Sequence, residues 1–240
     1  MTSIFFKLVS VLALSMVLSF PNGLKAGTNQ HEDFRDIHMI MNYGLTMILD
    51  GSSLIMMAEM DIDTAVEKDP LVHGNKMIDE GKALLNRALT GPVMVKKHME
   101  GQDKTKKMTL THQLGELMLK QAYSRDIMQP TGSKSDTVIK LHVMHLEEAH
   151  ALIMAAQGAN MVISGKGGTN NDLNRFSIEQ GRRMMTDAKT ILNNLLNGNT
   201  LKELEKEVLP PEEEKILKAT KEQLINSIDI ANLLIQMEYE

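Results

Sequence analysis

The sequence contains no cysteine and no tryptophan. Without cysteine the chain has no disulfide, no thiolate nucleophile and no thiolate ligand for haem, iron–sulfur clusters or zinc. Its fold must therefore be held together by the hydrophobic core alone, even if the protein works in an oxidising compartment.

Aromatic residues are also scarce, at 3% of the chain, and alternating apolar and polar runs rich in β-branched residues are missing. Methionine is abundant instead, with 20 residues. A core of Leu, Ile, Ala and Met favours helices, because unbranched side chains lose little rotamer freedom there. The composition predicts an all-α protein.

Basic charge is not in surplus: 26 Lys and Arg stand against 31 Asp and Glu, a net charge of −5. A protein that neutralises nucleic-acid phosphates needs a positive surface. We therefore expect no nucleic-acid partner.

The N-terminus has the pattern of an export signal. Lys7 precedes an apolar run over residues 8–20, which is short for a membrane span, and Pro21 breaks it before a cleavage point after Ala26. Residues 1–26 are interpreted as a signal peptide, which leaves 240 − 26 = 214 residues in a periplasmic or secreted protein with no further transmembrane segment. The alternative is an uncleaved membrane anchor.

Apolar residues at spacings of three and four predict six helices. A shorter helical stretch over residues 201–208 and irregular structure over the Lys-rich residues 93–107 are also expected, with a turn at residues 165–171. The helices are predicted at 36–60, 70–90, 109–129, 137–163, 172–197 and 211–237.

The helices repeat in sequence. A shift of 107 residues, without a gap, gives 11 identities in the 55 positions from 37 to 91, including Gly51 with Gly158 and Gly74 with Gly181. We interpret this as a duplication of three-helix repeats, 27–130 and 131–240. The expected architecture is an internally duplicated helical bundle whose repeats are related by a pseudo-twofold axis and share one core.

Histidines mark the candidate site. His38 and His145 are equivalent in the duplication, and equivalent residues can converge around a pseudo-twofold axis. Neighbours on the same helix faces can join them, because residues three and four apart are adjacent. The predicted metal ligands are His38, Met41, His142, His145, Glu148 and His150.

The ligand types point to copper or another soft or transition metal, because imidazole with thioether suits copper. Further methionines cluster at Met39, Met47, Met56, Met57 and Met60, and at Met94 and Met99 beside His98. Glu147 and His150 have the Glu-x-x-His spacing of di-iron bundles. However, the equivalent positions of the first repeat are Ile40 and Tyr43, so the second half of such a site is missing.

Two functions follow from these patterns. The first is an exported helical protein that binds copper or another soft or transition metal through His and Met. The second is a structural or interaction protein that holds a partner protein, a second copy or an apolar ligand in a Met-rich groove. An enzyme is the third alternative and the least favoured one, since no motif pairs a base with a nucleophile or two acids with each other.

Overall fold

The computed structural model describes residues 30–62, 69–91, 94, 102–124 and 135–237. The predicted signal peptide, His98 and Met99 lie outside these ranges. The chain divides into two units, Met1–Asp33 and Phe34–Glu240. All of the predicted metal ligands belong to the second unit.

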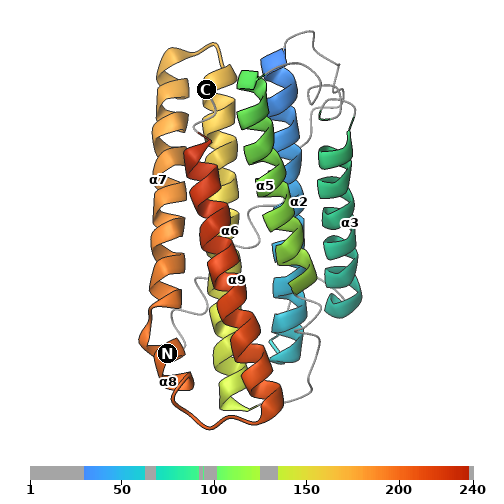
Figure 1. Ribbon diagram of the computed structural model, residues 1–240, viewed down its shortest axis with the longest axis vertical. Coiled ribbons are helices and arrows are strands. Elements are labelled where there is room, and N and C mark those ends of the chain that lie inside the picture. Colours follow the sequence, from blue (N-terminus) through green and yellow to red (C-terminus); the bar gives the residue numbers. More distant parts are fainter. Residues whose placement is uncertain (1–29, 63–68, 92–93, 95–101, 125–134, 238–240) are drawn as a thin grey trace. The chain divides into compact units, whose positions relative to one another are not determined.

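The described residues are helical and contain no strand, which confirms the all-α prediction. Six long helices run side by side (Figure 1). They are α2 (Gln30–Glu59), α3 (Pro70–Thr90), α5 (Gln102–Ser124), α6 (Asp136–Gly167), α7 (Asn171–Leu196) and α9 (Pro211–Gln236), with the short α8 (Asn199–Leu204) before α9. None of the helices in the described ranges combines the length and apolarity needed to cross a membrane.

Most helix boundaries follow from the local sequence. Asp69 caps α3, its side chain accepting from the backbone N–H of Val72 at 3.1 Å, and Pro70 opens the helix. Several predicted bounds were wrong. The first helix begins at Gln30 and not at residue 36, and the short helix ends at Leu204 and not at residue 208. The Lys-rich segment is helical from Gln102, and α6 continues through Gly165 to Gly167, so the turn begins later than predicted.

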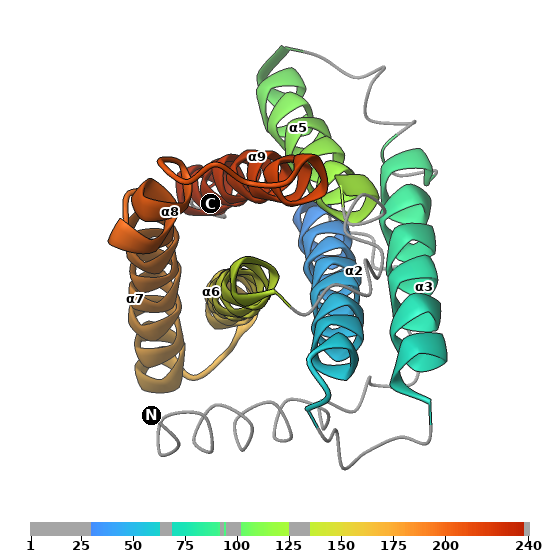
Figure 2. The same cartoon turned by 90° about the horizontal axis from the view of Figure 1, so that it is seen from below.

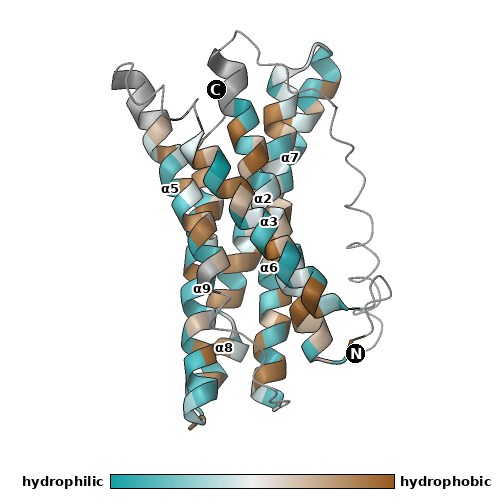
Figure 3. Ribbon diagram, turned by 90° about the vertical axis from the view of Figure 1, so that its right-hand side faces the viewer, coloured by the Kyte–Doolittle hydropathy of each residue, from teal (hydrophilic) through white to brown (hydrophobic). Residues whose placement is uncertain are grey.

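The long helices form two sets of three. In the first set α2 lies beside α3 and α5, and in the second α6 lies beside α7 and α9 (Figure 2). The sets meet where α2 runs antiparallel to α6 and where α5 packs against α9 (Figures 1 and 2). Hydrophobic and hydrophilic residues alternate along the helices, as expected when each helix buries one stripe (Figure 3).

Glycine pairs bring the first two helices of each set close together. A Cβ on Gly74 would lie 2.5 Å from the carbonyl oxygen of Gly51, and a Cβ on Gly158 would lie 2.6 Å from that of Gly181. No side chain fits at such distances. These two pairs are the same four glycines that the 107-residue shift aligns, which is what the duplication hypothesis requires.

The core is continuous across both sets. Its fully buried side chains come from all six long helices and include Met41, Leu45, Leu85, Leu114, Leu152, Leu192 and Leu224. At about 25 cal/mol per Å² of apolar surface, this burial is the dominant stabilising contribution in a chain without disulfides.

Candidate functional site

The predicted ligands are mostly inside the bundle. Histidines 38, 142 and 145 are buried, as are Met41 and Glu148, while His150 is exposed. Each of the three buried histidines is engaged by a side chain of another helix.

His145 and Glu148 form the centre of a buried polar network. His145 Nδ1 lies 2.9 Å from Glu148 Oε2, and His145 Nε2 lies 3.0 Å from Thr220 Oγ1 of α9. Glu148 Oε1 accepts from Gln121 Nε2 of α5 at 2.6 Å and from Ser227 Oγ of α9 at 2.5 Å. Three helices therefore meet at one carboxyl group.

His38 makes the corresponding contact in the first set. Its Nε2 lies 2.9 Å from Thr111 Oγ1 of α5, as that of His145 does from Thr220. Burial lowers the pKa of His38 to about 4, so the imidazole is neutral at pH 7. The sequence singled out both histidines but missed both threonines, because Thr111 and Thr220 align at a shift of 109, not 107.

His142 pairs with a residue that the sequence did not suggest. Its Nε2 lies 3.0 Å from Glu59 Oε2 at the end of α2, and the two side chains are 7% and 12% exposed. His142 Nδ1 and Glu59 Oε1 have no hydrogen-bond partner. This pair ties the C-terminus of α2 to the second turn of α6.

The structure does not bring His38 and His145 together. The contacts Arg35 to Lys166 and Glu59 to His142 fix α2 and α6 as antiparallel neighbours. His145 therefore lies level with about residue 56 of α2. With a rise of 1.5 Å per residue, roughly 27 Å of helix separates that level from His38. A site shared by the two histidines, Met41 and Glu148 is not formed.

The other candidates are likewise separate. His150 and Glu147 lie on the solvent side of α6 and do not converge with a second Glu-x-x-His motif. Among the described residues, no group of three or more His, Asp and Glu side chains is placed to hold a metal ion.

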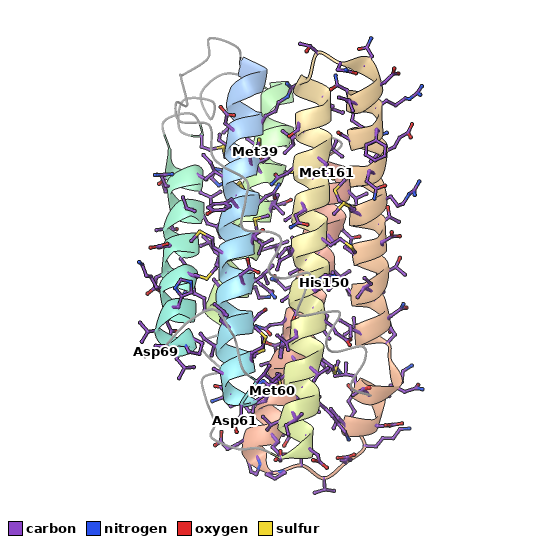
Figure 4. The ribbon with its side chains drawn as sticks, turned by 180° about the vertical axis from the view of Figure 1, so that it is seen from behind. Met39, Met60, Asp61, Asp69, His150 and Met161 are labelled. Atoms are coloured by element: carbon purple, nitrogen blue, oxygen red, sulfur yellow. The ribbon has the colours of Figure 1, made fainter. Side chains whose placement is uncertain are left out.

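A different pair of soft ligands flanks the α2–α6 contact. Asn42 Nδ2 donates to Asn160 Oδ1 at 2.8 Å, which sets these two residues side by side. Met39 lies one turn before Asn42, and Met161 follows Asn160. Both methionines project from neighbouring helices on the same face (Figure 4), and Met39 is 40% exposed. The Oδ1 atom of Asn42 is buried and has no hydrogen-bond partner.

The opposite end of the same contact carries no thioether at the related positions. The 107-residue shift aligns Met39 with Leu146 and Met161 with Leu54.

A separate buried polar group lies on α2. Asp50 Oδ1 is buried without a hydrogen-bond partner, and burial raises the pKa of Asp50 to about 6.

Comparison with known proteins identifies no relative. No family model matches the chain, and no curated protein or solved structure is significantly similar to it.

Proposed function

We propose that this chain is an exported helical protein that binds a soft metal ion, with Cu(I) as the preferred ligand and Met39 and Met161 as its thioether donors. The observation that carries the proposal is the Asn42–Asn160 hydrogen bond at 2.8 Å. It fixes the register in which Met39 of α2 and Met161 of α6 lie near one point of contact between the two helices (Figure 4).

The chemistry of the donors supports a soft ion. Thioether sulfur binds Cu(I) and Ag(I) and has little affinity for hard cations. The unpartnered Asn42 Oδ1 offers a partial negative charge beside the methionines, and a cation there would satisfy this buried atom. The three buried histidines are engaged in internal contacts, so they are not part of the proposed site.

Silver titration of the chain without residues 1–26 tests the proposal, since Ag(I) replaces Cu(I) without redox chemistry. One ion is expected per chain. Replacing both Met39 and Met161 with leucine should weaken binding at least about tenfold, because leucine keeps the volume and removes the donor.

The matched control replaces Met77 and Met184 with leucine. These half-buried residues are equivalent under the 107-residue shift and lie on α3 and α7, away from the α2–α6 contact. Silver binding that is unchanged in the Met39/Met161 variant, or weakened equally in the control, would reject the site.

A second candidate function is an interaction protein whose partner is a second copy or another protein. It is favoured by Tyr43, which is 41% exposed one turn from Met39 on the same helix. Methionine-rich surfaces adapt to varied partners. In this case Met39→Lys should lower self-association in sedimentation experiments, while the leucine variant, which keeps the apolar surface, should leave it intact.

A further inference from the structure

The hydrogen atoms of the buried network can be assigned from its fixed acceptors. Asn226 Nδ2 lies 2.9 Å from the carbonyl oxygen of Leu117, which only accepts, so this end of the amide is the NH₂ group. The same NH₂ donates to Gln121 Oε1 at 2.8 Å. The other end of Gln121 is therefore its NH₂ group, and it donates to Glu148 Oε1 at 2.6 Å.

The same reasoning places a proton on His145. Thr220 Oγ1 is 2.8 Å from the carbonyl oxygen of Ile216, so its only hydroxyl proton points there. Thr220 must then accept from His145, and His145 Nε2 carries a proton.

A second proton lies between His145 Nδ1 and Glu148 Oε2, which are 2.9 Å apart. Without this proton, the lone pair of His145 Nδ1 and the carboxylate oxygen of Glu148 would face each other in the core. Gln121 and Ser227 both donate to the other oxygen of Glu148, and two donors favour the ionised carboxylate. The arrangement is thus a buried imidazolium paired with a carboxylate.

We propose that the His145–Glu148 pair is a proton-locked latch that holds α5 and α9 against α6 and releases them when the pair loses its shared proton. Gln121 of α5 and Thr220 and Ser227 of α9 bind directly to the two charged groups. Loss of the proton leaves a buried carboxylate facing an unprotonated nitrogen, and an uncompensated buried charge is strongly destabilising.

The side chains of the packed helices that bond to the pair at the distances given above are uncharged: Gln121 from α5, and Thr220 and Ser227 from α9. From α2, Glu59 is bonded to His142, which lies one turn before His145 on α6. Lys221 of α9 is directed to Glu205. Met39 and Met161, the thioether donors of the proposed function, do not belong to this network.

The direction of the pH effect depends on the number of protons that each state binds. The folded pair holds one shared proton. Unfolded histidine loses its proton above about pH 6.5, so the folded state then binds one more proton than the unfolded state. Stability therefore falls as pH rises above about 6.5, and the unfolding equilibrium constant increases about tenfold per pH unit while the latch keeps its proton.

The first set of helices provides an internal comparison. His38 contacts Thr111 as His145 contacts Thr220, but Met41 stands where the second set has Glu148. The His38 contact has no carboxylate at that position and should contribute nothing to the alkaline loss of stability.

Two measurements on the chain without residues 1–26 test the latch. Ring-¹⁵N NMR should show both nitrogens of His145 protonated at pH 8. Urea unfolding between pH 7.5 and 8.5 should show an unfolding equilibrium constant that rises about tenfold per pH unit. This pH dependence should be weaker by one proton in Glu148→Gln and nearly unchanged in His38→Gln. Amide exchange in α5 and α9, corrected for intrinsic rates, should lose protection as the pH rises.

A singly protonated His145 ring at pH 8 would overturn the proposal. This NMR measurement uses the parent protein, so it does not depend on whether a variant folds. Equal alkaline slopes in the parent and Glu148→Gln would overturn it as well. Neither result depends on silver binding, so these experiments test the latch independently of the proposed metal site.

Discussion

At the scale of single residues, the buried histidine of the first set should make the protein sensitive to acid. Burial lowers the pKa of His38 to about 4, whereas in the unfolded chain it titrates near 6.5. Between these values the unfolded state binds the extra proton, so stability falls as pH decreases, by up to roughly 3 kcal/mol.

His38→Gln should remove this loss, because an amide can still bond to Thr111 but does not titrate. Urea unfolding at pH 7 and pH 4.5 measures the difference between the parent and the variant. His150→Gln, at an exposed position, is the control and should keep the acid sensitivity of the parent. An identical pH response in His38→Gln would show that His38 is not neutral when folded.

Asp50 should act in the opposite direction. Burial raises its pKa from 3.8 to about 6, so the folded state holds a proton that the unfolded state has lost between these values. Stability from this group falls as pH rises from about 4 to 6. At pH 7 the buried, ionised carboxylate destabilises the folded state. Asp50→Asn should therefore raise the free energy of unfolding by about 1–2 kcal/mol.

The gain in Asp50→Asn should disappear below pH 4, where Asp50 is protonated in both states. Thermal or urea unfolding at pH 7 and pH 3.5 gives the comparison. A variant that is no more stable than the parent at pH 7 would mean that the carboxylate finds compensation in the folded protein.

At the scale of helices, close packing at the glycines should outweigh helix propensity. Alanine is favoured over glycine inside a helix by about 1 kcal/mol. However, a Cβ on Gly158 would lie 2.6 Å from the carbonyl oxygen of Gly181 and 3.0 Å from Met184 Cβ. Gly158→Ala should therefore destabilise the protein by a net amount of roughly 1–3 kcal/mol.

The midpoint of urea unfolding measures this effect, with Ser164→Ala at an exposed position of the same helix as control. If Gly158→Ala proved more stable than the parent, α6 and α7 would have room to separate. In that event the glycine would not be needed for their contact.

The same glycines show where sequence patterns succeed and where they fail. The start of α3 was predictable, because Asp69 and Pro70 act on neighbouring residues. The end of α6 was not, since Gly165 is typical of a helix terminus but here sits against the backbone of Asn174. Local rules cannot detect a glycine that is required by a contact with another helix.

The predicted metal ligands show the same limit of local sequence patterns. The repeat identified His38 and His145 as important, and both do join two helices. The prediction that the two histidines converge was wrong. Because α2 and α6 pack antiparallel, equivalent residues lie at opposite ends of this helix pair. The residues near such an axis are those midway along the helices, and the sequence gives no direct sign of which end of each helix meets which.

At the scale of the whole molecule, the contacts between α2 and α6 obey the same shift as the sequence. Adding 107 to Arg35 gives His142, and adding 107 to Glu59 gives Lys166. The structure contains the two related contacts, Arg35 with Lys166 and His142 with Glu59. If the halves arose by duplication, one half should be able to take the place of the other.

The second repeat alone, residues 131–240, should therefore form a homodimer through α6. Its isolated α6 would expose the apolar surface that α2 and α5 cover in the full chain, and pairing with a second copy buries that surface again. Sedimentation equilibrium and circular dichroism of the fragment measure association and helicity together. A helical fragment that stays monomeric at high concentration would contradict the interchangeability of the halves.

The fragment also allows the contact at the helix ends to be tested by charge. In the dimer, His142 of each copy would face Lys166 of the other, where the full chain offers Glu59. Lys166→Glu would recreate an imidazole–carboxylate pair at both ends and should tighten the dimer about tenfold, at roughly 0.7 kcal/mol per pair. Lys166→Gln removes the positive charge without supplying a carboxylate, so it should tighten the dimer less. Equal dissociation constants for the two variants would mean that α6 does not meet its copy in the register that α2 has in the full chain.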